Sequence, residues 1–202
     1  MTAREISTGS GLEVGHHLRE QSALPRRIVA VGSSGAGKST MAAALSHRLG
    51  LPHIELDALR HGPNWAEVSD DQFRERLAVR VDEEAWVVDG NYGFSRDLSW
   101  SRAELVVWLD YSLPLVMARL LRRTFRRIVT REELWNGNRE SLLLALSPDS
   151  VVVWALKTFH RRRRQLLELS QRPEYAHLQV LRFRSPADAE EWLSRLPHQT
   201  SG

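Results

Sequence analysis

The chain has 202 residues, of which 42% are hydrophobic and 26% are charged, a composition that suits one α/β domain with a hydrophobic core and excludes wholesale disorder. It contains no cysteine, which excludes disulfides, zinc–thiolate sites and thiol catalysis. The formal net charge is only +3, and no apolar run reaches the roughly 18–20 residues that span a bilayer, so we expect a soluble cytoplasmic protein.

Residues 1–24 are rich in Gly, Ser and His and show no sustained hydrophobic period. We interpret them as a flexible leader outside the fold. The domain is expected to span residues 25–198, because regular hydrophobic patterns fill that range and no linker long enough to divide it occurs.

Five short apolar runs predict buried strands. In chain order they cover residues 28–31, 53–57, 86–89, 105–110 and 178–183.

Helices are predicted between these strands. The first carries Met41, Leu45 and Leu49 on one face, and a capping box of Ser69 and Gln72 begins the second. The later helices are expected at about 114–129, from 148 to about 170, and from 186 onward. Strands that alternate with helices predict a three-layer α/β sandwich with a parallel sheet.

The glycine-rich turn after the first strand matches the pattern GxxxxGK[ST]. Glycines let the backbone approach a phosphate closely, and the helix that follows directs its N-terminal N–H groups at the anion. Because an apolar strand precedes this turn and an amphipathic helix follows it, we predict an ATP-binding P-loop (Walker A), in which Lys38 reaches the β- and γ-phosphates and the Ser39 hydroxyl ligates magnesium. The predicted nucleotide contacts are Gly32, Ser33, Ser34, Gly35, Ala36, Gly37, Lys38, Ser39 and Thr40.

Three aspartates at predicted strand ends could serve the magnesium ion: Asp57, Asp89 and Asp110. All three could face the site, because ligands gather at the carboxyl ends of strands in open α/β sheets. The pattern of four apolar residues followed by aspartate fits Asp110 best, although a carboxylate at this position can also cap the next turn.

Several motifs resemble a known group of proteins. The loop GSSGAGKST at 32–40 and the Asp-Gly pair at 89–90 are similar to the adenylate-kinase-like group. More narrowly, DGNY at 89–92, ELWNGNRES at 133–141 and RSP at 184–186 resemble the bacterial topology modulation proteins, whose label carries an association with DNA supercoiling. The resemblance covers about residues 27–196.

The resemblance implies a P-loop NTPase fold of the nucleoside monophosphate kinase type, with five parallel core strands. It also implies an acceptor-binding insertion at about 58–70 and an arginine-rich lid at about 130–147. In such proteins Asp89 rather than Asp110 would support the magnesium ion, and Arg184, Ser185 and Pro186 would lie beside the nucleotide base.

The sequence departs from adenylate kinases directly after Asp89. Those enzymes continue with a proline and an arginine that holds the acceptor phosphate, whereas Asn91 and Tyr92 stand near this position here and the nearest arginine is Arg96. The departure argues against AMP as the acceptor.

Arginine accounts for 26 of the 28 basic residues, which reflects either drift in a GC-rich genome or guanidinium groups that line a polyphosphate site. One helix carries a stripe at Arg119, Arg122, Arg123, Arg126 and Arg127, which is either a solvated face or, for Arg119 and Arg123, a clamp on adenine or phosphate. The apolar side of this helix is predicted from Met117, Leu120, Leu121, Phe125 and Ile128.

Two arginines are expected to act on the transferring phosphoryl group. Arg131 and Arg139 flank the turn at 135–138, so a closing lid would bring them to the developing charge. Of the four consecutive arginines at 161–164, Arg161 and Arg164 are expected to face the site.

Asp57 is the candidate group that accepts the proton of an acceptor hydroxyl, with an acidic turn residue as the alternative. Trp65 would form part of the pocket wall. The predicted acceptor site thus comprises Asp57, Trp65, Asn91, Tyr92, Arg96, Arg161 and Arg164.

These features favour a magnesium-dependent kinase that transfers the γ-phosphate of ATP to a small molecule or nucleotide. The alternatives are an ATP-binding, nucleic-acid-associated regulatory protein and a polynucleotide 5′-hydroxyl kinase, for which the basic stripe is the support. The protein is expected to be a monomer or a homodimer.

Overall fold

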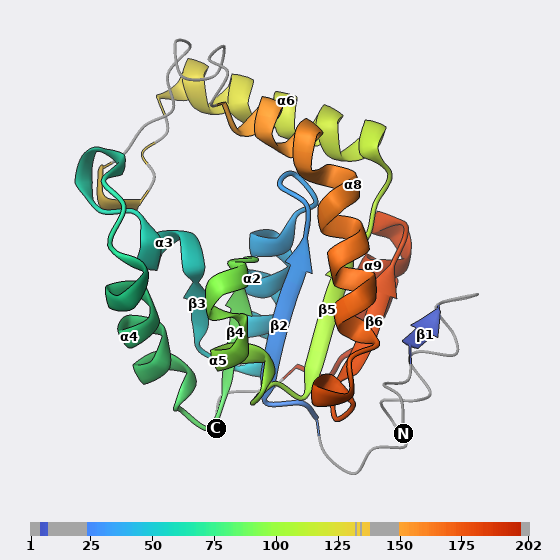
Figure 1. The fold of residues 1–202 in the computed structure, drawn as a ribbon. Helices are drawn as coiled ribbons and strands as arrows, with labels where there is room; N and C mark the ends of the chain where they lie inside the picture. The colour runs from blue at the N-terminus through green and yellow to red at the C-terminus, as the bar shows by residue number, and fades with distance from the viewer. Residues whose placement is uncertain (1–4, 8–23, 132, 134, 138–149, 199–202) are drawn as a thin grey trace.

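The computed structural model describes residues 5–7, 24–131, 133, 135–137 and 150–198. These residues form a six-stranded parallel sheet in the order β1-β6-β5-β2-β4-β3, with helices on both faces (Figure 1). The strands are β1 (Glu5–Ser7), β2 (Arg27–Gly32), β3 (His53–Glu55), β4 (Trp86–Asp89), β5 (Leu105–Leu109) and β6 (Gln179–Phe183).

The five-stranded parallel core, β2 to β6, confirms the predicted fold class. The sixth strand, β1, falls within the segment that the sequence predicts to be a leader, and it pairs in parallel with β6 from Glu5↔Val180 to Ser7↔Arg182. Three residues of that segment therefore belong to the sheet, whereas residues 1–4 and 8–23 lie outside the described part of the chain.

The helices are α2 (Lys38–Leu49), α3 (Leu56–Arg60), α4 (Asp70–Val81), α5 (Arg96–Trp100), α6 (Leu113–Thr130), α8 (Val151–Ser170) and α9 (Pro186–Arg195). Short 3₁₀ turns are η1 (Pro63–Trp65), η2 (Gly93–Ser95), η3 (Trp135–Gly137) and η4 (Pro173–Tyr175). None of the described helices combines the length and the apolar character that a membrane crossing requires.

Alternate strand residues face two separate cores. Ile28 and Ala30 pack on one face with α2, α9 and the start of α6, whereas Val29 and Val31 pack on the other with α4, α5 and the end of α8. This two-sided burial explains why the strands appear in the sequence as continuous apolar runs.

Two elements differ from their predicted extent. Strand β3, predicted to cover residues 53–57, ends at Glu55, and the next five residues form α3. Asp57 therefore lies in the first turn of a helix and not on the strand. Helix α8 begins at Val151, where the Ser150 hydroxyl accepts a hydrogen bond from the Val153 N–H. The predicted start at residues 147–148 lies outside the described residues.

The buried side of α6 also differs from the prediction. Val116, Leu120 and Thr124 are buried, whereas Leu121 and Phe125 are 53% and 70% exposed. The helix runs across the end of the molecule toward which the strands point, so it does not lie flat on the sheet (Figure 1). Its packing is therefore set by the P-loop beneath and by α8 beside it, rather than by its widest apolar face.

Candidate active site

The predicted P-loop connects β2 to α2 at the carboxyl edge of the sheet. The loop closes with a hydrogen bond from the Ala36 N–H to the Ser33 carbonyl at 3.0 Å, and the Lys38 ammonium folds back to the same carbonyl at 3.3 Å. The N-terminus of α2 has no side-chain cap and no acidic residue in its first turn. Its N–H groups are therefore available for an anion.

The loop depends on its glycines at two points. Gly35 has a φ of +88°, and an added Cβ would lie 2.7 Å from the carbonyl oxygen of Val116 in α6. Gly37 has a φ of +97° and caps α2 in the left-handed region that disfavours other residues. Helix α6 thus packs directly on the loop, and only glycine permits this contact.

Lys38 lies where charges from four different elements meet. Burial is the main cause that lowers the pKa of Lys38, and the negative charges of Asp57 in α3 and Asp89 in β4 oppose it. The positive charges of Arg123 in α6 and Arg162 in α8 lower the pKa of Lys38 further. The fold therefore brings two carboxylates and two guanidinium groups within electrostatic range of the P-loop lysine.

Asp57 is held by Tyr92, which follows β4. The Tyr92 hydroxyl donates a 2.7 Å hydrogen bond to Oδ1 of Asp57. Burial raises the pKa of Tyr92, and the Asp57 charge raises it further, so the phenol stays protonated and serves as a donor. One carboxylate oxygen of Asp57 is therefore occupied and oriented.

Asp89 and Asp110 occupy different environments. Asp89 is buried, and His53 Nε2 lies 3.6 Å from its Oδ1, a contact that raises the pKa of His53. Asp110 instead forms ion pairs with Arg182 at 2.6 Å and Arg163 at 3.0 Å. Asp110 thus joins β5, β6 and α8.

Arg119 and Arg123 both lie half-buried on α6. The Arg119 guanidinium donates to the Ala36 carbonyl of the P-loop at 3.3 Å and lies 5.4 Å from the ring centroid of Tyr111. Arg122 and Arg126 of the same stripe are exposed.

The four consecutive arginines of α8 differ in their exposure. Arg161 and Arg164 are exposed, whereas Arg162 and Arg163 are half-buried. The buried residues Phe159 and Leu166 set the rotation of the helix, and Arg162 and Arg163 fall on the same side as these two. Lys157 shares the exposed side with Arg161 and Arg164, as the sequence predicts.

The predicted acceptor insertion contacts the predicted lid. Trp65 adopts a left-handed backbone with a φ of +59°, and its ring meets His61 edge-on at 5.5 Å. From the lid turn η3, the Asn136 amide donates to the His61 carbonyl at 2.5 Å. Arg131, whose side chain is exposed, ends α6 in a left-handed conformation, and Arg139 lies outside the described residues.

Two further groups complete the placement of the predicted residues. The Arg96 guanidinium donates to Oδ1 of Asn91 at 3.0 Å, and Asn91 directly precedes Tyr92 in the sequence. At the carboxyl end of β6, Arg184 is exposed, and the Ser185 hydroxyl accepts from the Asp188 N–H to cap the helix that Pro186 opens.

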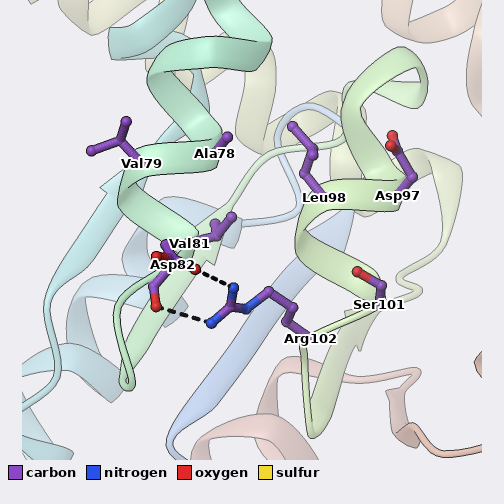
Figure 2. Close-up of a pocket in the computed structure, with 8 residues that line it drawn as sticks. All are labelled: Ala78, Val79, Val81, Asp82, Asp97, Leu98, Ser101 and Arg102. Atoms are coloured by element: carbon purple, nitrogen blue, oxygen red, sulfur yellow. Dashed lines mark hydrogen bonds and ion pairs between the residues drawn. The ribbon is translucent and has the colours of Figure 1, made fainter.

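A surface groove of about 580 Å³ lies between α4 and α5, between Val79 and Leu98, and the Asp82–Arg102 ion pair spans one end of it (Figure 2). Asp82 and Arg102 precede β4 and β5, so the groove lies at the amino ends of the strands. It contains none of the predicted site residues, and ligands of open α/β sheets bind at the other edge.

The described residues contain no cluster of three or more His, Asp or Glu side chains that could hold a metal ion by themselves. The Ser39 hydroxyl and the Asp89 carboxylate are nonetheless hard oxygen donors at the P-loop. This small donor set fits magnesium, which is held by one or two protein groups together with substrate phosphates.

Comparison with solved structures identifies similar folds. A shikimate kinase from Acinetobacter baumannii, solved with shikimate, aligns with a TM-score of 0.50 and 19% identity over 84% of this chain and 89% of that one. A gluconokinase from Sinorhizobium meliloti 1021 aligns with a TM-score of 0.46 and 21% identity over 85% and 93% of the two chains. An unliganded sugar kinase from Janibacter sp. HTCC2649 aligns with a TM-score of 0.46 and 19% identity over 85% and 92%.

No protein-family model and no curated protein matches the sequence. The likeness to the shikimate kinase shows that this chain has the fold of the P-loop kinases. It identifies no substrate, because only 19% of the residues are shared.

Sequence reasoning missed two residues near the site, His53 and Arg162. The phase of α8 could have identified Arg162, because the buried positions Phe159 and Leu166 place it inward. No sequence signal indicates the approach of His53 to Asp89, because the two residues lie on paired neighbouring strands whose register only the fold sets.

Proposed function

We propose that this protein is a magnesium-dependent kinase that transfers the γ-phosphate of ATP to a hydroxyl group of a small molecule. The observation that carries the proposal is that the P-loop with Lys38, the Tyr92-bonded Asp57, and Arg119, which donates to the loop carbonyl of Ala36, lie at the carboxyl edge of the sheet. A phosphate donor, a candidate proton acceptor and stabilising cations would thereby meet at one sheet edge, as phosphoryl transfer requires. The fold of the P-loop kinases is consistent with the proposal.

In the proposed reaction, the N–H groups of the P-loop and the Lys38 ammonium hold the β- and γ-phosphates. The acceptor hydroxyl oxygen forms a bond to the γ-phosphorus, and the bond from that phosphorus to the β–γ bridging oxygen breaks, so ADP leaves with the electron pair. The hydroxyl proton passes to Asp57, whose Oδ2 is left for the acceptor because Oδ1 accepts from Tyr92. Arg119 and Arg123 would contact the nucleotide from α6.

The Ser39 hydroxyl and the Asp89 carboxylate would hold magnesium, which neutralises phosphate charge when it is bound. Asp110 is not assigned this role, because both of its oxygens face arginines. Arg131 and Arg139 of the lid are proposed to approach the γ-phosphate on closure, and Arg184, Ser185 and Pro186 to lie beside the base.

The test is ATP consumption with magnesium across a panel of sugar acids, nucleosides, nucleoside monophosphates and 5′-hydroxyl oligonucleotides. One small acceptor should stimulate turnover, and Lys38→Ala should abolish it. Asp57→Asn should lower kcat by about 10²- to 10⁴-fold and leave ATP binding intact.

The same panel separates the alternatives, which the topology modulation resemblance keeps open. Phosphorylation of oligonucleotides alone would make the protein a polynucleotide kinase. Tight, salt-sensitive DNA binding without any stimulated ATP use would refute the kinase and favour a nucleic-acid-associated regulator.

A further inference from the structure

A buried carboxylate and a largely buried imidazole lie side by side on β4 and β3. The side chains of Asp89 and His53 are 5% and 17% exposed. His53 Nε2 is buried without a hydrogen-bond partner, and within the described part of the chain no hydrogen bond reaches the Asp89 carboxylate. Buried polar groups are nearly always hydrogen-bonded, so this pair requires an explanation.

The register of the two strands brings the groups together. His53 pairs with Val87, and Glu55 pairs with Asp89, in the parallel ladder of β3 and β4. Residues two apart on a strand point to the same face, so His53 and Asp89 share the face on which Val87 packs with α2. The distance from Nε2 of His53 to Oδ1 of Asp89 is 3.6 Å, and a shift of about 0.5 Å would turn this contact into a hydrogen bond.

Asp89 also belongs to the surroundings of the P-loop. Its negative charge raises the pKa of Lys38, against the effect of burial. Two arginines, Arg163 and Arg182, hold the Asp110 carboxylate, whereas no described arginine lies at ion-pair distance from Asp89. Among the described side chains, His53 is therefore the one cationic or N–H donor at ion-pair distance that can orient the Asp89 carboxylate.

We infer that His53 is a positioning residue for Asp89: its Nε2–H holds Oδ1 and leaves the other carboxylate oxygen for the magnesium–nucleotide complex. The inference rests on the proposed kinase function and adds a residue to its metal site. A group that holds a metal-binding carboxylate restricts its rotation, and loss of such a group weakens metal affinity about 10- to 100-fold. An imidazole with its hydrogen on Nε2 donates from that atom in the neutral and the charged ring alike, so this role does not depend on titration.

The experiment uses two amides that differ in reach. The amide nitrogen of Gln matches the position of Nε2 in histidine, whereas that of Asn matches Nδ1, so His53→Gln keeps a donor near Asp89 and His53→Asn does not. A fluorescent ATP analogue is titrated in EDTA and then at increasing magnesium. These titrations give the metal-free affinity for nucleotide and the magnesium concentration that produces half of the gain in affinity.

His177→Asn is the control variant. The His177 ring lies 3.3 Å from the Trp100 carbonyl and shortly before β6, at the amino edge of the sheet, so it is remote from the P-loop. Circular dichroism and melting temperature show whether each variant is folded. His53→Leu, which fills the buried space without a donor, provides the same test if His53→Asn is unfolded.

His53→Asn should raise the half-effective magnesium concentration about tenfold and leave the metal-free affinity unchanged, because the P-loop that holds the phosphates is intact. His53→Gln should restore most of this loss, and His177→Asn should match the wild type. In the double variant with Asp89→Asn, His53→Asn should add no further loss, because a residue that acts through Asp89 has no effect once that carboxylate is removed.

The outcomes separate this inference from the proposed function. An unchanged magnesium dependence in His53→Asn, an equal loss in both amide variants, or an additive loss in the double variant would overturn the positioning role and leave the kinase standing. The expected magnesium dependence without ATP use stimulated by any acceptor would support the role and overturn the kinase. Nucleotide binding by the wild type that does not respond to magnesium would overturn both.

Discussion

Substitution of Asp110 and Asp89 should separate the aspartate that stabilises the fold from the one that serves the nucleotide. Asp110 follows β5, its side chain is 4% exposed, and it accepts from Arg182, which is 7% exposed, at 2.6 Å. Arg163 approaches the same carboxylate at 3.0 Å. Asp110→Asn would leave the buried Arg182 guanidinium without a counter-charge, whereas Asp89→Asn removes a carboxylate that has no arginine at ion-pair distance among the described residues and lies 3.6 Å from His53.

Removing one partner of a buried ion pair costs about 3–5 kcal/mol, and we expect the lower end for Asp110→Asn because the amide oxygen still accepts one hydrogen bond. For a chain of this size a loss of about 3 kcal/mol corresponds to a fall in melting temperature of about 6–12 °C. Asp89→Asn should change the free energy of unfolding by less than about 1 kcal/mol. It should instead weaken the magnesium dependence of ATP binding by about 10- to 100-fold.

The assay is urea unfolding of both variants, followed by titration of a fluorescent ATP analogue with and without magnesium. An Asp110→Asn protein that is as stable as the wild type but no longer responds to magnesium would refute this reasoning. It would show that the strand-end pattern of four apolar residues and an aspartate had identified the metal carboxylate after all.

Three further substitutions test the fold around the site. Gly35→Ala should destabilise the protein by about 1–3 kcal/mol in thermal unfolding, because the added Cβ would lie 2.7 Å from a carbonyl of α6 at a φ of +88°; an unchanged melting temperature would contradict the packing of α6 on the P-loop. Ser150→Ala should cost about 1 kcal/mol through loss of the α8 cap, and a value near zero in urea unfolding would show that α8 begins elsewhere. Contact with Asp89 raises the folded-state pKa of His53. The metal-free wild type should therefore be more stable than His53→Asn below about pH 6.5, and this difference in the free energy of unfolding should decline as the pH rises through the folded-state pKa. A difference that does not depend on pH would argue against the contact.

The fold could be predicted because local rules and tertiary packing agree along most of the chain. Ser69 caps α4 as the capping box predicts, accepting from the Gln72 N–H at 3.2 Å. Met41, Leu45 and Leu49 are buried on one face of α2. Such signals depend on neighbours within four residues, so the sequence alone is sufficient for them.

The errors arise where the environment of a residue comes from distant parts of the chain. Asp57 continues an apolar pattern, but the backbone turns into α3 after Glu55, and no local signal marks the change. Leu120, Leu121 and Phe125 are predicted on one apolar side of α6, yet α6 rests on Gly35 of the P-loop, which buries Leu120 and leaves Leu121 and Phe125 exposed. For the four consecutive arginines of α8, the helical period alone does not tell which of them face the protein interior, because that depends on the buried neighbours Phe159 and Leu166.

Composition alone does not tell whether the many arginines reflect genome drift or function. The ion-pair partners of each arginine separate those that stabilise the fold from those that could bind a ligand. Arg60, Arg102 and Arg182 each face a carboxylate, so their charges stabilise the fold and say nothing about a ligand. A guanidinium that is partly removed from water and lacks such a partner costs free energy in the unliganded protein. Half-buried arginines with no carboxylate at ion-pair distance among the described residues, such as Arg119 of α6 and Arg162 of α8, are therefore more informative about a ligand than the paired ones.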